Sequence, residues 1–146
     1  LSDPPTILRA VTLNPNTRLL ALQEGLEPFA RAVLGHIPER TEVFDPREPL
    51  LVMGSSEDIA RWLADTGLSE ISAPFARRGA ARMWTFPESP TVLVSADDSE
   101  ALQRLVGMLR HHGHRSYVVQ DSSGRTIENG VWDSPNSALR VELEPL

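Results

Sequence analysis

The stretch LLVMGSSEDIARWLADTGL, residues 50–68, decides the fold class. It opens with Leu50–Met53, a continuous apolar run that is typical of a strand buried on both faces. Ser55 followed by Asp58 is a capping-type helix start, and apolar side chains then recur at helical spacing until Gly67. The stretch therefore predicts a buried strand, a tight turn and an amphipathic helix, in that order.

A second unit with the same layout follows at residues 91–113. Thr91–Val94 predicts another strand buried on both faces, and Asp97 with Glu100 predicts the start of its helix. A further strand is predicted at Ser116–Gln120. Two strand–helix units followed by a strand imply right-handed crossovers. We therefore predict an α/β domain: a three-layer sandwich with a mainly parallel, flavodoxin- or Rossmann-like sheet and antiparallel C-terminal additions.

The remaining elements follow from weaker patterns. Strands are predicted at Thr6–Leu13, Thr41–Phe44, Ala81–Phe86, Arg125–Trp132 and Leu139–Leu143, with a turn at Asp121–Gly124. Helices are predicted around Leu19, Leu20, Leu22 and Leu26, from Pro28 to Gly35, and from Asp98 to His112.

Size and charge limit the partners. The chain has 146 residues, a net charge of −6 and a pI near 5.2. We predict one domain over residues 1–146, and Leu in place of Met at position 1 suggests that it was excised from a larger protein. The acidic balance argues against nucleic acid as a partner, and no apolar run is long enough for membrane insertion. Other domains of a parent chain, or a protein partner, are expected instead.

Two missing residue types exclude several kinds of chemistry. The chain has no Cys, which excludes thiol nucleophiles and thiolate metal sites. All fourteen basic residues are Arg, and the absence of Lys excludes a Walker-type phosphate grip and Schiff-base chemistry. No G-x-S-x-G or H-E-x-x-H motif occurs. We therefore predict no catalytic residue and no cofactor for this chain by itself.

Five residues at the predicted carboxyl edge of the sheet are candidates for ligand binding. Gly54, Ser55 and Ser56 follow one strand at the start of a helix, where backbone N–H groups suit an anion. Asp97 and Asp98 follow the next strand, where paired carboxylates suit Mg²⁺. The alternative is structural: Ser55 caps the first helix, Asp97 caps the second, and Asp98 sits in its first turn.

Three histidines lie close together in the sequence. His112 and His114 are candidate zinc ligands if the chain turns at Gly113, whereas adjacent His111 and His112 point about 100° apart on a helix. The alternative is a helix C-terminus that favours partly cationic imidazoles. Elsewhere, Trp62, Trp84 and Trp132 are candidates to line a sugar or peptide groove, with core packing the stronger interpretation for Trp62.

The segment RGAARMWTFPESPTVLVSADDSEALQRLVGMLRHHGHRSYVVQDSSGRTIENGVW, from Arg78 to Trp132, carries a family resemblance. It resembles a C-terminal module of bacterial aminopeptidase N-like zinc metallopeptidases, in which GxAxxWT, VLVSAxDxxAL, SYxV and GVW recur in this order. This sequence has His112 before Gly113, where that module usually carries an aromatic residue. Its LLVxG-like and VLVSA strands are also similar to flavodoxin-like domains of envelope polysaccharide-export subunits.

The first resemblance implies that the catalytic zinc motif lies in a separate upstream domain. It further implies a location in the periplasm or cell envelope. The expected function is therefore that of a non-catalytic accessory or interaction domain of an envelope-associated protein. The alternative is a small-molecule or anion-binding domain that uses the carboxyl edge of its sheet.

Overall fold

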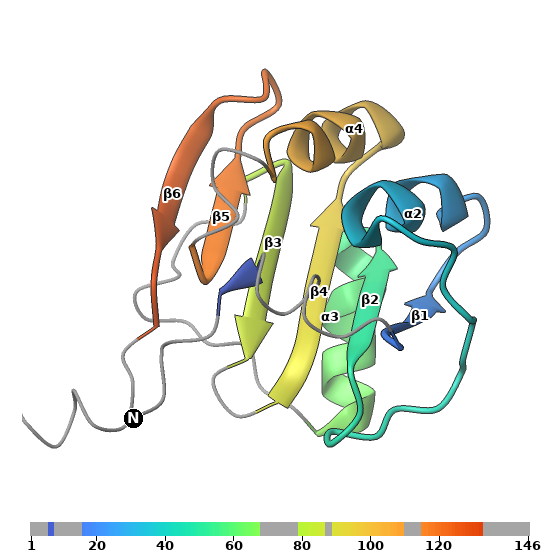
Figure 1. Cartoon of the computed structure of the whole chain (residues 1–146). Coiled ribbons are helices and arrows are strands. Elements are labelled where there is room, and N and C mark those ends of the chain that lie inside the picture. The colour runs from blue at the N-terminus through green and yellow to red at the C-terminus, as the bar shows by residue number, and fades with distance from the viewer. Residues whose placement is uncertain (1–5, 8–15, 68–78, 87–88, 110–114, 133–146) are drawn as a thin grey trace, which may run out of the picture.

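The computed structural model of the chain describes residues 6–7, 16–67, 79–86, 89–109 and 115–132 (Figure 1). Among these residues, no helix combines the length and the apolar character that crossing a membrane requires. The described elements form one mixed α/β arrangement, with a single sheet and helices packed against it.

Six strands form the sheet in the order β1-β2-β4-β3-β5-β6. They are β1 Arg18–Ala21, β2 Leu50–Gly54, β3 Ala81–Phe86, β4 Ser89–Ala96, β5 Tyr117–Gln120 and β6 Thr126–Gly130. β1, β2 and β4 are parallel to one another, whereas β3 is antiparallel to both β4 and β5, and β6 is antiparallel to β5. The α/β class and the antiparallel C-terminal addition are confirmed, but the prediction of a mainly parallel sheet is wrong.

The short connection between β3 and β4 explains the difference. Only residues 87–88 separate the two strands, and Phe86 is paired with Ser89. A parallel connection needs a dozen or more residues, so a link this short can only form a hairpin. The first predicted unit is therefore a strand and helix that lead into an antiparallel strand, not a crossover between neighbouring parallel strands.

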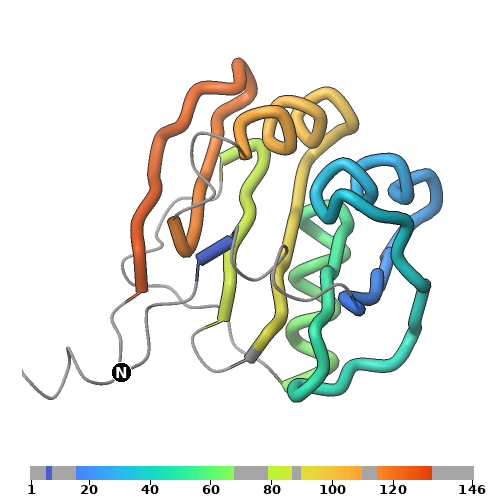
Figure 2. Tube along the Cα trace, in the orientation of Figure 1, coloured from blue at the N-terminus to red at the C-terminus, as the bar shows by residue number. Residues whose placement is uncertain are grey.

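The helices are α2 Glu27–Leu34, α3 Ser56–Thr66 and α4 Ser99–Gly107. α2 and α4 lie side by side on one face of the sheet and α3 lies on the other (Figures 1 and 2). α2 joins β1 to β2 and α4 joins β4 to β5, and both connections step in the same direction across the sheet. Connections of the same hand that step in the same direction place their helices on the same face.

Two hydrophobic clusters fill the space between the sheet and the helices. Met53, Leu102 and Leu105 belong to the cluster under α2 and α4, and Val52 and Ile59 belong to the cluster under α3. Successive residues of β2 therefore point to opposite faces, and all of β2 is buried. This confirms the strand that the apolar run Leu50–Met53 predicts.

β1 replaces a helix that the sequence pattern predicts. Leu19 packs in one cluster and Leu20 in the other, as the two-residue period of a strand requires. A short apolar run fits both a strand and a buried helix, so the leucine spacing alone was ambiguous. The helix predicted from Pro28 to Gly35 is confirmed as α2, with Gly35 in the left-handed conformation at its C-terminus.

Other predicted boundaries need correction. Thr41–Phe44 is not a strand; instead Arg40 makes an isolated parallel bridge to Leu19. Ile7 has helical backbone where a strand was predicted, and most of Thr6–Leu13 lies outside the described residues, as does Leu139–Leu143. α4 ends at Gly107, Leu109 is again helical, and the predicted helix end at His112 lies outside the described residues.

Trp132 anchors the antiparallel end of the sheet. Its indole Nε1 donates to the Thr85 carbonyl oxygen at 2.7 Å, and its ring stacks on Tyr117 with centroids 4.5 Å apart. Its backbone N–H donates to the Ser116 hydroxyl at 2.9 Å. Trp132, the second residue after β6, thereby links the end of β6 to β3, two strands away in the sheet.

Candidate functional site

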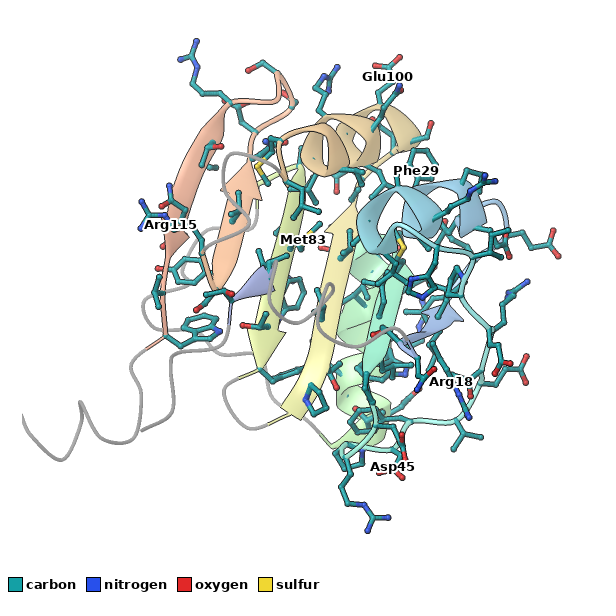
Figure 3. All side chains as sticks on the ribbon, viewed as in Figure 1. Arg18, Phe29, Asp45, Met83, Glu100 and Arg115 are labelled. Carbon is teal, nitrogen blue, oxygen red and sulfur yellow. The ribbon has the colours of Figure 1, made fainter. Side chains whose placement is uncertain are left out.

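A crevice of about 220 Å³ lies where the parallel strands end. It is bounded by the residues that follow β1, by the end of β2, by the end of β4 and by the starts of α2 and α4. Its polar lining consists of Gln23, Glu24, Ser55, Asp97, Asp98 and Ser99. Figure 3 shows Phe29 on α2, which lines the crevice together with Leu102 of α4.

The structure brings the predicted edge residues together. Gly54, Ser55, Asp97 and Asp98 all line this crevice. Ser56 is adjacent, and its hydroxyl donates to a carboxylate oxygen of Asp97 at 3.2 Å. The parallel pairing of β2 with β4 produces this meeting, because it places the carboxyl ends of both strands at the same edge.

Two of these residues cap helices. The Ser55 hydroxyl accepts a hydrogen bond from the Asp58 N–H at 3.1 Å, which confirms the predicted cap of α3. The Asp98 carboxylate accepts from the Ala101 N–H at 2.8 Å. Asp98 is therefore the cap of α4, and the assignment of that role to Asp97 is wrong by one residue. The reason is that the strand continues through Ala96, which leaves Asp97 in the turn.

Gly54 has a packing role at the floor of the crevice. A Cβ at this position would lie 2.9 Å from the Leu22 Cβ, closer than side-chain carbons normally approach. The Leu22 N–H also donates to the Met53 carbonyl oxygen at 2.9 Å. The absence of a side chain at Gly54 thus lets the chain leaving β1 pass close to β2.

The crevice contains both acceptors and donors. Glu24, Asp97 and Asp98 contribute carboxylates. The Gln23 amide and the Ser99 hydroxyl are its side-chain donors. The start of α2 adds little, because Pro28 has no N–H and the Phe29 N–H donates to the Leu26 carbonyl oxygen at 3.1 Å. Within the described ranges, no group of three or more His, Asp or Glu side chains is arranged to hold a metal ion.

The histidines give no site that the structure describes. His111, His112 and His114 lie outside the described residues. His36 follows α2, and its Nε2 is buried without a hydrogen-bond partner in the described part of the chain. The tryptophans line no common groove: Trp84 and Trp132 are buried, and Trp62 packs edge-to-face on Phe44 with ring centroids 5.2 Å apart.

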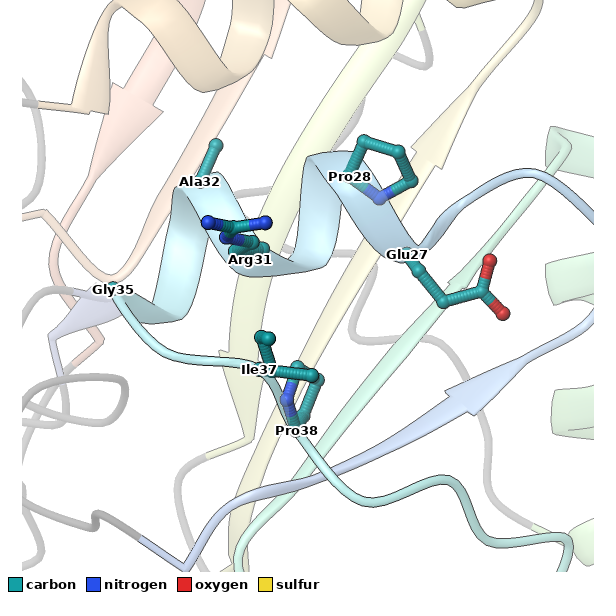
Figure 4. Close-up of a pocket in the computed structure, with 7 residues that line it drawn as sticks. All are labelled: Glu27, Pro28, Arg31, Ala32, Gly35, Ile37 and Pro38. Carbon is teal, nitrogen blue, oxygen red and sulfur yellow. The ribbon is translucent and has the colours of Figure 1, made fainter.

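A larger groove of about 590 Å³ runs along α2 (Figure 4). Pro28, Ala32, Gly35, Ile37 and Pro38 give it a mainly apolar lining, with Glu27 and Arg31 as its charged members. Ile37 is 75% exposed, the largest value among the exposed large hydrophobic residues that the structure describes. Sequence reasoning missed this groove because a single Ile in a proline-rich loop has no periodicity.

A second hollow of about 420 Å³ adjoins this groove and shares Ile37 and Pro38 with it. Its lining is polar and includes Arg18, His36, Glu39 and Glu48. Arg18 lies on the edge strand β1 (Figure 3), and its Nε is 3.9 Å from a carboxylate oxygen of Glu39. The segment from 36 to 39 therefore separates an apolar hollow from a polar one.

Comparison with family models, with curated protein sequences and with solved structures gives no match for this chain.

Proposed function

We propose that the chain is a non-catalytic interaction domain that binds an extended segment of a partner protein, or of its own parent chain, in the α2 groove. The observation that carries the proposal is the 75% exposure of Ile37 within a hollow lined by Pro28, Ala32 and Pro38. An apolar hollow with an exposed aliphatic side chain at its wall gains free energy when a partner covers it.

The groove is also well supported from beneath. Ala30, Val33 and Leu34 on the inner side of α2 are buried in the cluster against the sheet, and Gly35 ends the helix. A surface on a packed helix keeps its shape when a partner binds, so little ordering entropy is lost.

The proposal includes the wider setting. The parent is an envelope-associated bacterial protein, possessing a metallopeptidase domain elsewhere in its chain, and this domain is an accessory unit. This part rests on the sequence resemblance between Arg78 and Trp132. We further propose a three-layer arrangement, which the two hydrophobic clusters on opposite faces of the sheet support.

Selection from a displayed library of random twelve-residue peptides, with the whole 146-residue chain immobilised, tests the proposal. We expect peptides whose binding is abolished by Ile37→Asp. Val43→Asp is the matched control, because Val43 is 73% exposed in the same connecting segment but does not line the groove. Failure to select peptides, or equal binding to Ile37→Asp and the unaltered chain, would contradict the proposal.

A second candidate function is the binding of a small molecule or anion in the crevice at the carboxyl edge. The observation that favours it is the meeting of Gly54, Ser55, Asp97 and Asp98 around one cavity next to the uncapped start of α2. Carboxylates beside the Gln23 amide and the Ser99 hydroxyl suit a polar ligand that has both donors and acceptors. Thermal-shift screening with nucleotides, sugar phosphates and divalent metals tests it.

The size of the expected shift makes that screen decisive. A ligand at a hundred times its dissociation constant stabilises the folded chain by about 2.7 kcal/mol. Substitution of Asp97 by Asn should then reduce the shift, whereas the same substitution at Asp45, a partly exposed residue outside the crevice, should leave it unchanged. A flat screen across these compounds would remove the second candidate.

A further inference from the structure

The charged residues of the α2 groove are arranged unusually. Glu27 and Arg31 stand four residues apart on one helix, the spacing at which oppositely charged side chains normally pair. Glu27 instead forms an ion pair with Arg40, whose Nη1 lies 2.9 Å from the Glu27 carboxylate. Arg31 consequently has no ion-pair partner among the described residues.

Five of the other exposed arginines that the structure describes differ from Arg31 in this respect, whereas exposed Arg125, just before β6, resembles it. Carboxylates lie within 4.0 Å of the guanidinium nitrogens of Arg18, Arg40, Arg47, Arg61 and Arg104. Arg31 instead lines the groove between Pro28, Ala32 and Ile37 (Figure 4). Within the described part of the chain it is therefore an unpaired cation beside an apolar surface, on the helix that forms the groove.

We infer that the segment bound in the α2 groove is acidic, with a carboxylate that pairs with Arg31 and a neighbouring apolar side chain that covers Ile37. The inference rests on the proposed function and adds the chemistry of the partner. A guanidinium recognises a carboxylate through two parallel N–H···O bonds, which fixes the position of the segment as well as its charge. Covering the groove also removes water from the pair and strengthens it.

Because the chain is acidic, a preference for acidic peptides would distinguish specific binding at Arg31 from non-specific electrostatic attraction. At −6, the domain as a whole attracts basic peptides and repels acidic ones. Non-specific electrostatic binding would therefore enrich Lys and Arg in the selected peptides. Enrichment of Asp or Glu beside an aliphatic or aromatic residue requires a local cation, and Arg31 supplies it.

The test compares the peptides selected by the unaltered chain with those selected by Arg31→Glu. We expect acidic–apolar peptides from the first selection and basic–apolar peptides from the second. Calorimetric titration of one acidic peptide should show a loss of affinity of about tenfold on Arg31→Gln, and a larger loss on Arg31→Glu. Arg61→Glu, at an exposed position on the opposite face, is the matched control and should leave affinity unchanged.

The outcomes separate the inference from the proposed function. Peptides that depend on Ile37 but show no acidic enrichment, and that bind Arg31→Glu equally well, would overturn the inference and leave the interaction function standing. Peptides that ignore Ile37 would overturn both. If Arg31→Glu fails to fold, as circular dichroism would reveal, replacing the acidic residue of the peptide by Lys tests the same pair on the unaltered chain.

Discussion

The Ser56 hydroxyl donates a hydrogen bond to the Asp97 carboxylate at 3.2 Å, which links the first residue of α3 to the residue after β4. The two residues are 41 positions apart in the sequence. They meet because β2 and β4 are parallel neighbours whose carboxyl ends lie at one edge. The neighbours of these two residues, Ser55 and Asp98, carry the caps of the two helices.

Ser55 and Ser56 should differ in their effect on stability. Ser55→Ala removes the acceptor for the Asp58 N–H and should lower the free energy of unfolding by about 1 kcal/mol. Ser56→Ala removes an exposed hydrogen bond and should cost less than about 0.5 kcal/mol. Urea denaturation followed by circular dichroism measures both. A larger loss for Ser56→Ala would mean that the cap of α3 is misassigned.

The same comparison applies to the second helix. Asp98→Ala should lower the free energy of unfolding by about 0.5 to 2 kcal/mol, because the Ala101 N–H loses its acceptor. Asp97→Ala should have the smaller effect, since Asp97 caps no helix and its contact with Ser56 is exposed. A larger loss of unfolding free energy for Asp97→Ala than for Asp98→Ala in denaturant titrations would show that Asp97 is the cap of α4.

Leu105 should be a major contributor to the core under α4. Its side chain is fully buried in the cluster that includes Met53 and Leu102. Leu105→Ala should cost about 2 to 5 kcal/mol through lost burial and a residual cavity. Val106→Ala is the control, because Val106 is only partly buried on the same helix. Equal losses for the two variants, measured by chemical denaturation, would show that α4 faces the sheet differently.

The turn between β5 and β6 should contribute a pH-dependent part of the stability. Hydrogen bonds from the Ser123 side chain and the Arg125 backbone lower the pKa of Asp121 below its ordinary value of 3.8. A lowered folded-state pKa stabilises the fold at pH above the unfolded value, and this contribution is lost as the pH falls through the folded value.

Asp121→Asn should therefore destabilise the chain most at neutral pH, and the difference from the unaltered chain should shrink below about pH 4. Melting temperatures across this range measure the effect. Asp65→Asn, on the last turn of α3, is a comparison outside the turn. A constant difference between Asp121→Asn and the unaltered chain from neutral to acid pH would show that the carboxylate has no such role.

Apolar runs and helix-capping residues in the sequence predicted those elements whose formation depends mainly on residues close together in the chain. The apolar run Leu50–Met53 and the Ser55 cap identify β2 and the start of α3, because burial on both faces and capping leave residue-level patterns. The meeting of Ser55 with Asp97 at one edge was likewise predictable, since β2 and β4 are parallel. The cap of α4 was missed by one residue because Asp97 and Asp98 are chemically identical.

Features that depend on the rest of the chain were not predictable in this way. Leu19 and Leu20 form a strand because β2 offers a partner on one side and Glu39 and Thr41 supply backbone bonds on the other. Arg31 has no ion-pair partner in the ranges that the structure describes, because Glu27 pairs with Arg40, and Arg40 comes from a loop with no periodic pattern. Which of several possible partners such a residue contacts depends on the tertiary structure, and a local sequence pattern does not contain that information.

The two-residue connection between β3 and β4 also has a kinetic consequence. These strands occupy the centre of the sheet, yet their pairing closes the shortest loop, so its entropic cost is small. We expect the folding nucleus to form there, with β1 and β2 docking later across a longer loop. Leu93→Ala should then lower the folding rate constant, whereas Leu19→Ala should mainly raise the unfolding rate constant. Stopped-flow chevron plots of the two variants measure both rate constants. Nascent chains would accordingly acquire the middle of this sheet before its edge.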